Sequence, residues 1–185
     1  MTTRYVSLDP ALSTGWAVFE SSDCVLFKLS RFGFFDVPHS SEFVGDWLLE
    51  ADRLMRDLLE GLPEVQKAFV EDYYFVKKYC TGVDINYKIR GIYEAALRRR
   101  EVPYEMIAPQ TWSAWLKPGV PRRRKLSVTE SKEATKAAVV ERFKLAIPER
   151  MGRRKTPSDV YDAIGIGIFA IVRQHPGARF EYDEV

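Results

Sequence analysis

The stretch Tyr5–Phe19, YVSLDPALSTGWAVF, predicts a strand, a tight turn and a returning strand. Tyr5–Leu8 has the β-branched, aromatic and aliphatic residues of a buried strand, which ends on Asp9 because Pro10 cannot donate to a strand ladder. Gly15 permits the chain to reverse into the second strand of a hairpin. Asp9 either caps the turn through its side chain or belongs to a site, since buried carboxylates are rare unless they are paired or bind a metal.

The composition is that of a globular protein. Of its 185 residues, 46% are hydrophobic and 29% are charged, so we expect a single domain over residues 1–185. No apolar run reaches the roughly 20 residues that a membrane helix needs, so we expect no membrane partner. Two cysteines and two widely separated histidines argue against a disulfide framework and a zinc site. The early first strand leaves no room for a signal peptide, and we expect a cytoplasmic protein.

Positive charge is concentrated in one segment. Residues 121–155 carry 12 basic and 4 acidic residues, a net of +8, whereas residues 1–120 (14 basic, 17 acidic) and 156–185 (2 basic, 5 acidic) each have a net of −3. This asymmetry favours a polyanion partner, nucleic acid in particular, over the alternative of a solvated basic surface. Two basic loops are predicted, at 117–127 and 148–156, where prolines and glycines interrupt any periodic pattern.

The rest of the chain alternates strands and helices. Further strands are predicted at Val25–Val37, Lys67–Tyr74 and Tyr104–Ile107. The spacing of apolar residues predicts helices from Ser40 or Ser41 to about Glu60, over Val83–Arg100, from Pro109 through Trp115, from Thr129 or Ser131 to about Leu145, and over Ser158–Arg173. This order is typical of a ribonuclease-H-like fold. It is an α/β fold in which helices flank a central mixed five-stranded sheet that begins with three antiparallel strands.

Three more carboxylates fall where they can join Asp9. Glu71 and Asp72 close the fourth strand, and only one of them can face Asp9 because adjacent strand residues point to opposite faces. We favour Glu71, directly after the apolar run, and Asp72 is the alternative. Asp159 and Asp162 share a face of the first turns of the last helix, where compensation of the helix dipole is the other explanation. In a ribonuclease-H-like fold these elements meet, so four carboxylates would converge.

Nucleic-acid contacts are predicted in three places. Aromatic residues interleaved with lysines follow the fourth strand and suit stacking on bases and pairing with phosphates, with a cluster at the edge of the core as the alternative. The two basic loops are the other places. The candidates are Tyr74, Lys77 and Lys78 after the strand, Arg122, Arg123, Arg124 and Lys125 in the first loop, and Arg153, Arg154 and Lys155 in the second.

Four segments in order resemble the RuvC-type Holliday junction resolvases, including their phage and viral relatives. They are LDPALSTGWAV, FVEDYYF, ESKEATKAAVVERF and SDVYDAIGIGIFA, and the resemblance spans about residues 4–173. It implies that Tyr74 lies beside the junction, that Lys132 is the basic residue at the start of its helix, and that Val83–Arg100 forms a homodimer interface. It also implies that the metal-binding carboxylates are Asp9, Glu71, Asp159 and Asp162.

The resemblance implies a crossover junction endodeoxyribonuclease that resolves four-way and other branched DNA by paired symmetric nicks, in a bacterium or a phage-infected cell. Oxygen ligands alone suit Mg²⁺ or Mn²⁺, two ions per active site, which can activate a water and stabilise the leaving 3′ oxygen. We expect Asp9 to bridge the ions, Glu71 and Asp162 each to favour one, and Asp159 to assist. Lys132 or Lys155 would stabilise the charge that develops on the phosphate.

Two alternatives stay open. One keeps the fold and changes the substrate, giving a ribonuclease-H-like nuclease that acts on RNA–DNA hybrids or on DNA packaging ends. The other is a catalytically inactive module that binds DNA junctions. Fold alone does not decide among these functions.

Overall fold

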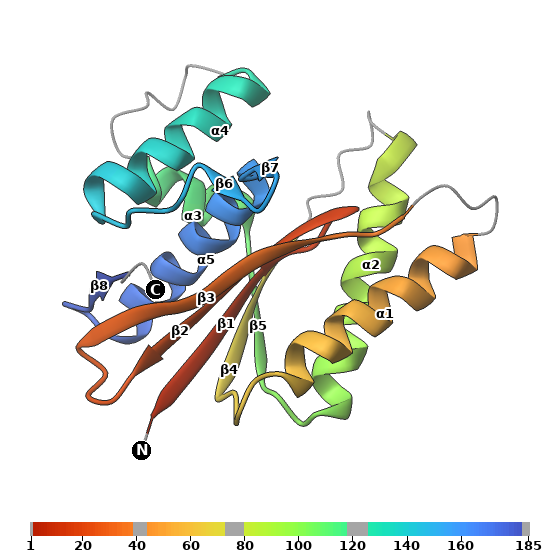
Figure 1. Cartoon of the computed structure of the whole chain (residues 1–185), viewed down its shortest axis with the longest axis horizontal. Coiled ribbons are helices and arrows are strands. Elements are labelled where there is room, and N and C mark those ends of the chain that lie inside the picture. Colours follow the sequence, from red (N-terminus) through yellow and green to blue (C-terminus); the bar gives the residue numbers. More distant parts are fainter. Residues whose placement is uncertain (1, 39–43, 73–79, 118–125, 183–185) are drawn as a thin grey trace.

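A computed structural model describes residues 2–38, 44–72, 80–117 and 126–182. They form a six-stranded mixed sheet in the order β5-β4-β1-β2-β3-β8, with helices on both faces (Figure 1). The first three strands, which are β1 (Thr3–Asp9), β2 (Ser13–Ser21) and β3 (Leu26–Asp36), run antiparallel, as predicted. Next to β1, β4 (Lys67–Glu71) and then β5 (Tyr104–Ile107) continue the sheet in parallel.

The prediction of five strands is wrong by one. The strand β8 (Arg179–Glu181) adds to β3 in parallel at the far edge of the sheet. This strand is three residues long, largely exposed, and begins two residues after the positive-φ Gly177. The sequence did not predict it because so short and exposed a strand has no apolar run or alternation.

Helices divide between the two faces of the sheet (Figure 1). One face carries α1 (Val44–Glu60) and α2 (Cys80–Arg99), and the other carries α3 (Pro109–Leu116), α4 (Val128–Ala137) and α5 (Ser158–Gln174). Strand alternation feeds a separate core on each side. Val6 and Leu8 pack with α1 and α2, whereas Tyr5 packs with α5. No described helix is both long enough and apolar enough to span a membrane.

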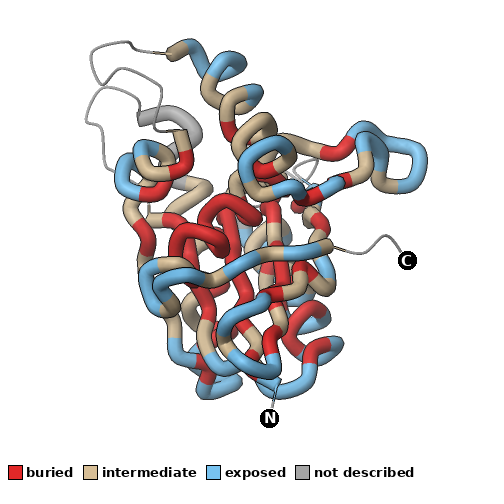
Figure 2. The backbone as a smooth tube through the Cα atoms, turned by 90° about the vertical axis from the view of Figure 1, so that its left-hand side faces the viewer, coloured by how far each residue is buried: buried red, intermediate tan, exposed pale blue. Residues whose placement is uncertain are grey.

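Helix α5 lies unusually close to the strands beneath it. A Cβ atom on Gly167 would lie 2.3 Å from the Phe19 ring, and one on Gly15 would lie 1.9 Å from the backbone oxygen of Asp159. The Ser7 hydroxyl donates a hydrogen bond of 2.7 Å to the carbonyl of Ala163 and fixes this contact. Figure 2 shows the buried positions gathered in the middle of the molecule. The first turn of α5 is thereby held against the β1–β2 turn that follows Asp9.

The predicted helix from Thr129 or Ser131 to about Leu145 has different bounds. Ser127 caps it, because its hydroxyl accepts from the Glu130 amide while the Glu130 carboxylate accepts from the Ser127 amide. After α4 the helix widens into a π-helical turn, η1 (Ala138–Arg142), and ends there. The predicted loop 148–156 contains a small hairpin of β6 (Arg150–Met151) and β7 (Arg154–Lys155). The predicted caps Ser40 and Ser41 lie outside the described residues.

Candidate metal centre

Two carboxylates lie side by side at the ends of neighbouring strands. In the parallel register of β1 and β4, Leu8 pairs with Val70, so Asp9 and Glu71 are the next residues on the two strands. Both side chains are buried, each residue being 8% exposed. They follow the alternation that faces α5, whereas Asp72 forms an ion pair with Arg90 of α2. The structure thus places Glu71, and not Asp72, beside Asp9.

The first turns of α5 bring two more carboxylates to the same place. Oxygen atoms of Asp9, Asp159 and Asp162 all lie within 4.8 Å of one another. Asp159 arrives there because its backbone packs on Gly15, where any larger residue would collide. Glu71 lies beside Asp9 on the neighbouring strand, close enough that its charge raises the pKa of Asp9. The four residues predicted from the sequence therefore lie together, at the ends of β1 and β4 and in the first turns of α5.

Burial and mutual repulsion shape the ionisation of this cluster. Burial, and next the negative charges of Glu71 and Asp162, raise the pKa of Asp9 well above its usual range. Burial raises the pKa of Glu71 to about 7 and that of Asp162 to about 6, although hydrogen bonds to Glu71 and the Lys132 charge near Asp162 act in the opposite direction. A divalent cation would relieve both effects, and an all-oxygen donor set fits Mg²⁺ or Mn²⁺.

Two lysines lie next to the carboxylates. The Lys132 Nζ atom is 3.1 Å from an Asp159 oxygen and 2.7 Å from the Ser158 hydroxyl. Lys117, which the sequence did not single out, donates to the hydroxyls of Ser131 and Thr135 at 3.0 and 3.1 Å. Burial lowers the pKa of Lys117, against the opposing effect of the Asp162 and Glu71 carboxylates. The cluster is thus bordered by two positive charges carried on α4 and at the end of α3.

Trp112 of α3 is the second residue of the site that the sequence did not single out. Its indole N–H donates a hydrogen bond of 2.8 Å to a Glu71 oxygen, and the residue is only 4% exposed. The Lys117 Nζ atom lies 5.7 Å from the centre of the same ring. A signal was present, because a buried tryptophan needs an acceptor for its N–H and a buried carboxylate needs donors. Trp112 thus holds the Glu71 carboxylate in one orientation, as groups that hydrogen-bond to the ligands of a metal site do.

The turn after Asp9 is fixed from the opposite face of the sheet. The Thr14 hydroxyl donates to the Ala11 carbonyl at 2.6 Å and accepts from the Ala11 amide at 3.2 Å. The Thr14 hydroxyl oxygen also lies 2.8 Å from the hydroxyl oxygen of Tyr93 in α2. Because the Thr14 proton already goes to Ala11, Tyr93 must be the donor in this hydrogen bond. Thr14 and Tyr93 are both fully buried. Helix α2 thus contacts the segment that connects Asp9 to Gly15.

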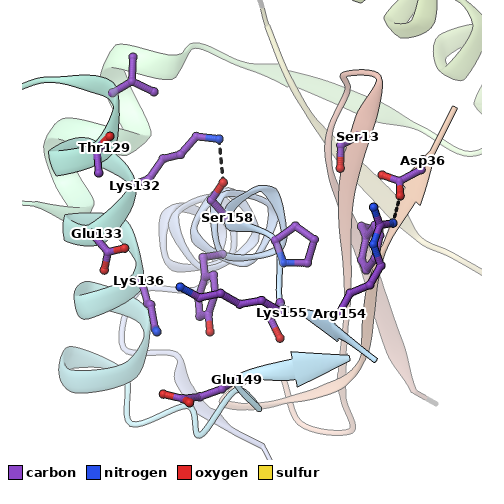
Figure 3. A pocket seen from close by; sticks show the side chains of 15 residues that line it. Ser13, Asp36, Thr129, Lys132, Glu133, Lys136, Glu149, Arg154, Lys155 and Ser158 are labelled. Carbon is purple, nitrogen blue, oxygen red and sulfur yellow. Dashed lines mark hydrogen bonds and ion pairs between the residues drawn. The ribbon is translucent and has the colours of Figure 1, made fainter. Parts of the chain in front are cut away.

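Two open grooves adjoin the cluster. One, of about 430 Å³, is lined by Glu71, Trp112, Lys117, Lys132 and Asp162 and forms the mouth of the site. The other, of about 850 Å³, lies between α4 and the β6–β7 hairpin with the first turn of α5 behind it (Figure 3).

The structure describes only some of the predicted DNA contacts. Arg154 and Lys155 line the larger groove, and Arg153 is exposed in the hairpin turn. Arg154 forms an ion pair with Asp36 of β3 and lies 5.6 Å from the centre of the Phe34 ring. Among the described residues, Lys155 forms no ion pair with the four carboxylates, unlike Lys132. The other predicted contacts, Tyr74, Lys77, Lys78, Arg122, Arg123, Arg124 and Lys125, lie outside the described residues.

Three solved structures that share this architecture are Holliday junction resolvases. Thermus thermophilus RuvC in complex with a Holliday junction substrate matches with a TM-score of 0.69 and 14% identity, over 96% of this chain and 99% of that one. A second Thermus thermophilus RuvC structure matches with a TM-score of 0.68 and 16% identity, over the same shares of the two chains. The yeast mitochondrial Holliday junction resolvase matches with a TM-score of 0.59 and 8% identity, over 91% of this chain and 78% of that one.

The sequence by itself matches no family model and no curated protein. At these identities the likeness concerns the backbone, and it extends over nearly the whole chain. The prediction of a ribonuclease-H-like α/β fold is therefore confirmed: this chain has the fold of the RuvC resolvases.

Proposed function

We propose that this chain is a metal-dependent endonuclease that resolves Holliday junctions and related branched DNA by paired nicks. One observation carries the proposal. Carboxylate oxygens from Asp9, Asp159 and Asp162 gather within 4.8 Å, with Glu71 beside Asp9 on the neighbouring strand, on a fold shared with RuvC. The fold alone would also suit a binding module. The buried carboxylates favour a metal-dependent nuclease over a binding module, because four clustered carboxylates destabilise a fold unless a bound cation neutralises them.

Two divalent ions held by Asp9, Glu71, Asp159 and Asp162 would supply an activated water and neutralise charge on the scissile phosphate. In this proposal Asp9 would contribute to holding both ions, Glu71 and Asp162 would each help to hold one, and Asp159 would assist. Trp112 keeps the Glu71 carboxylate in one orientation through its indole N–H. Lys132 and Lys117 border the same point and can donate hydrogen bonds to the non-bridging oxygens of the phosphate.

A homodimer and a DNA surface complete the proposal. A four-way junction needs two symmetric cuts, which two copies related by a twofold axis would provide, with α2 as the interface implied by the resemblance. Tyr74 and the basic residues predicted from the sequence would contact the DNA, in a cytoplasmic setting. A monomeric mass in solution and on junction DNA, measured by light scattering, would contradict the dimer.

The test is cleavage of a labelled immobile four-way junction, with linear duplex and an RNA–DNA hybrid alongside, in Mg²⁺, Mn²⁺ or EDTA. We expect paired symmetric nicks in the junction that require metal and disappear in Asp9→Asn and Glu71→Gln. The matched control is Asp72→Asn, which removes the neighbouring carboxylate that faces away from the site. This variant should cut at close to the wild-type rate.

The alternatives make different predictions in the same assay. Cleavage of the hybrid alone would keep the metal centre and change the substrate. Junction binding without cleavage in either metal would point to a binding module and refute the nuclease. Equal loss of cleavage in Glu71→Gln and Asp72→Asn would contradict the assignment of Glu71 to the site.

A further inference from the structure

The larger groove beside the metal centre has walls from two different elements. On one side α4 contributes Lys132 and Lys136, which are four residues apart and share a helix face, and on the other side the hairpin contributes Arg154 and Lys155 (Figure 3). The groove reaches the carboxylates through Lys132, which contacts both Ser158 at the groove and Asp159 in the cluster. A molecule in this groove would thus lie next to the metal centre.

The segment that forms both walls is basic. Residues 128–156 carry eight basic and four acidic residues, a net of +4. Within the described part of the chain, neither Lys136 nor Lys155 forms an ion pair, although Lys136 lies 5.8 Å from the centre of the Tyr161 ring. Figure 3 shows both lysines pointing into the groove. Glu133 and Glu149 also line it, and both are exposed.

The hairpin wall is fixed in place before any ligand binds. Thr156 closes its base, since its hydroxyl donates to the Pro148 carbonyl at 2.6 Å and its amide donates to the Glu149 carbonyl at 2.9 Å. The ion pair of Arg154 with Asp36 ties the hairpin to β3. Gly152, with a φ of +61°, makes its turn. Arg154 therefore anchors the wall, and Lys155 and Lys136 are the cations that face the groove from opposite sides.

We propose that this groove binds the sugar–phosphate backbone of the DNA strand that continues from the scissile phosphate, with Lys136 and Lys155 on neighbouring phosphates. The inference rests on the proposed nuclease function and adds to it the path of the cut strand. A DNA strand carries a negative charge at each nucleotide and can meet cations on both walls, and backbone contacts of this kind fix the register of a substrate without reading its sequence.

The experiment compares the Lys136→Gln/Lys155→Gln double variant with Lys28→Gln/Lys144→Gln, which removes two lysines that do not line the groove. Junction affinity is measured in EDTA over a range of salt, so that cleavage plays no part. Each phosphate contact contributes about 0.7–0.9 to the slope of log K against log salt. Loss of two contacts should lower the slope by about 1.4–1.8 and the affinity by about 25- to 60-fold near 0.1 M salt. The control should keep the wild-type slope.

A second arm locates the contacts on the DNA. Neutral methylphosphonates replace single phosphates within about three nucleotides of the nick, where neighbouring contacts would fall. They should weaken the wild type and the control at the contacted positions but leave the groove variant unchanged there. A groove variant with the slope of the control, or equal methylphosphonate effects in all three proteins, would overturn the groove assignment. Because these measurements need no cleavage, failure of the nuclease proposal would appear separately in the junction assay.

Discussion

The contact between Gly15 and the first turn of α5 gives the sharpest test of how the carboxylate cluster is assembled. A Cβ atom at position 15 would lie 1.9 Å from the backbone carbonyl oxygen of Asp159 and 2.3 Å from the carbon of the same carbonyl. Ordinary van der Waals contacts begin near 3.4 Å, so Gly15→Ala requires β2 and α5 to move apart by 3.4 − 1.9 = 1.5 Å. The two Asp159 atoms that the Cβ would meet belong to the backbone, so no side-chain rotation can relieve the overlap.

The movement would fall directly on the carboxylate cluster. The carboxylate oxygens of Asp9, Asp159 and Asp162 lie within 4.8 Å of one another. A shift of 1.5 Å in α5 is therefore about a third of the largest distance between the oxygens of Asp9 and the α5 aspartates. A misplacement of about 1 Å in a catalytic constellation costs roughly 100-fold in rate. We expect Gly15→Ala to lower the single-turnover rate of junction cleavage by at least about 100-fold and to lower stability by about 1–3 kcal/mol.

The matched control is Gly45→Ala, because a Cβ atom there has no neighbour within 4 Å. Gly45 lies in α1, where alanine should stabilise the helix by about 0.5–1 kcal/mol and leave cleavage unchanged. Rates are compared at a temperature where thermal melts show all three proteins folded, and Mn²⁺ titration reports the centre independently. A Gly15→Ala protein that cuts within about threefold of wild type and binds Mn²⁺ equally well would refute this account of the site.

Three further predictions concern the residues around the cluster. Trp112→Phe removes the donor to Glu71 and should weaken Mn²⁺ binding by about 10-fold or more, as measured by titration calorimetry, and unchanged affinity would show that this hydrogen bond does not position the ligand. Tyr93→Phe removes the donor to Thr14 and should cost about 1 kcal/mol in thermal melts and slow cleavage several-fold, whereas a stability loss with normal cleavage would confine Tyr93 to the core. In EDTA, the folded pKa values of Glu71 (about 7) and Asp162 (about 6) lie above those of the unfolded chain, so the folded state takes up protons. The melting temperature should rise as the pH falls from about 8 to 5, and the rise should be smaller in Asp9→Asn; a flat profile would contradict the raised pKa values.

Local pattern predicted which carboxylates end a strand or begin a helix, whereas their convergence was expected from the fold and from the resemblance. From the sequence, the alternation of β4 allowed only one of Glu71 and Asp72 to face Asp9, and the position directly after the apolar run favoured Glu71. The structure places Phe69 on the α5 side and Ala68 and Val70 on the other, which puts Glu71 on the side of Asp9. The three-residue spacing of Asp159 and Asp162 likewise follows from helix geometry. Such periodicities are properties of the chain itself, so they survive whatever the element packs against.

Trp112 and Lys117 could not be predicted in the same way. The sequence indicated a helical turn and the start of a basic loop there, but not the direction from which α3 approaches the sheet. That direction depends on tertiary contacts, among them hydrogen bonds from the Arg142 guanidinium to the carbonyls of Trp115 and Leu116 at the end of α3. Arg142 itself lies in the π-helical turn that the pattern of apolar residues did not indicate. Each of these placements depends on another, and none is encoded in a local period.

The same contacts explain how four mutually repelling carboxylates can be held together. No single element could do so, because like charges in a buried place favour separation. The β1–β4 ladder fixes Asp9 beside Glu71, the Gly15 contact fixes Asp159, and Ser7 clamps α5 from below. These restraints come from both faces of the sheet, since Tyr93 reaches the Asp9 turn from the side of α2. The packing of the rest of the fold therefore offsets the cost of bringing the four carboxylates together, and it holds them in place without any bound cation.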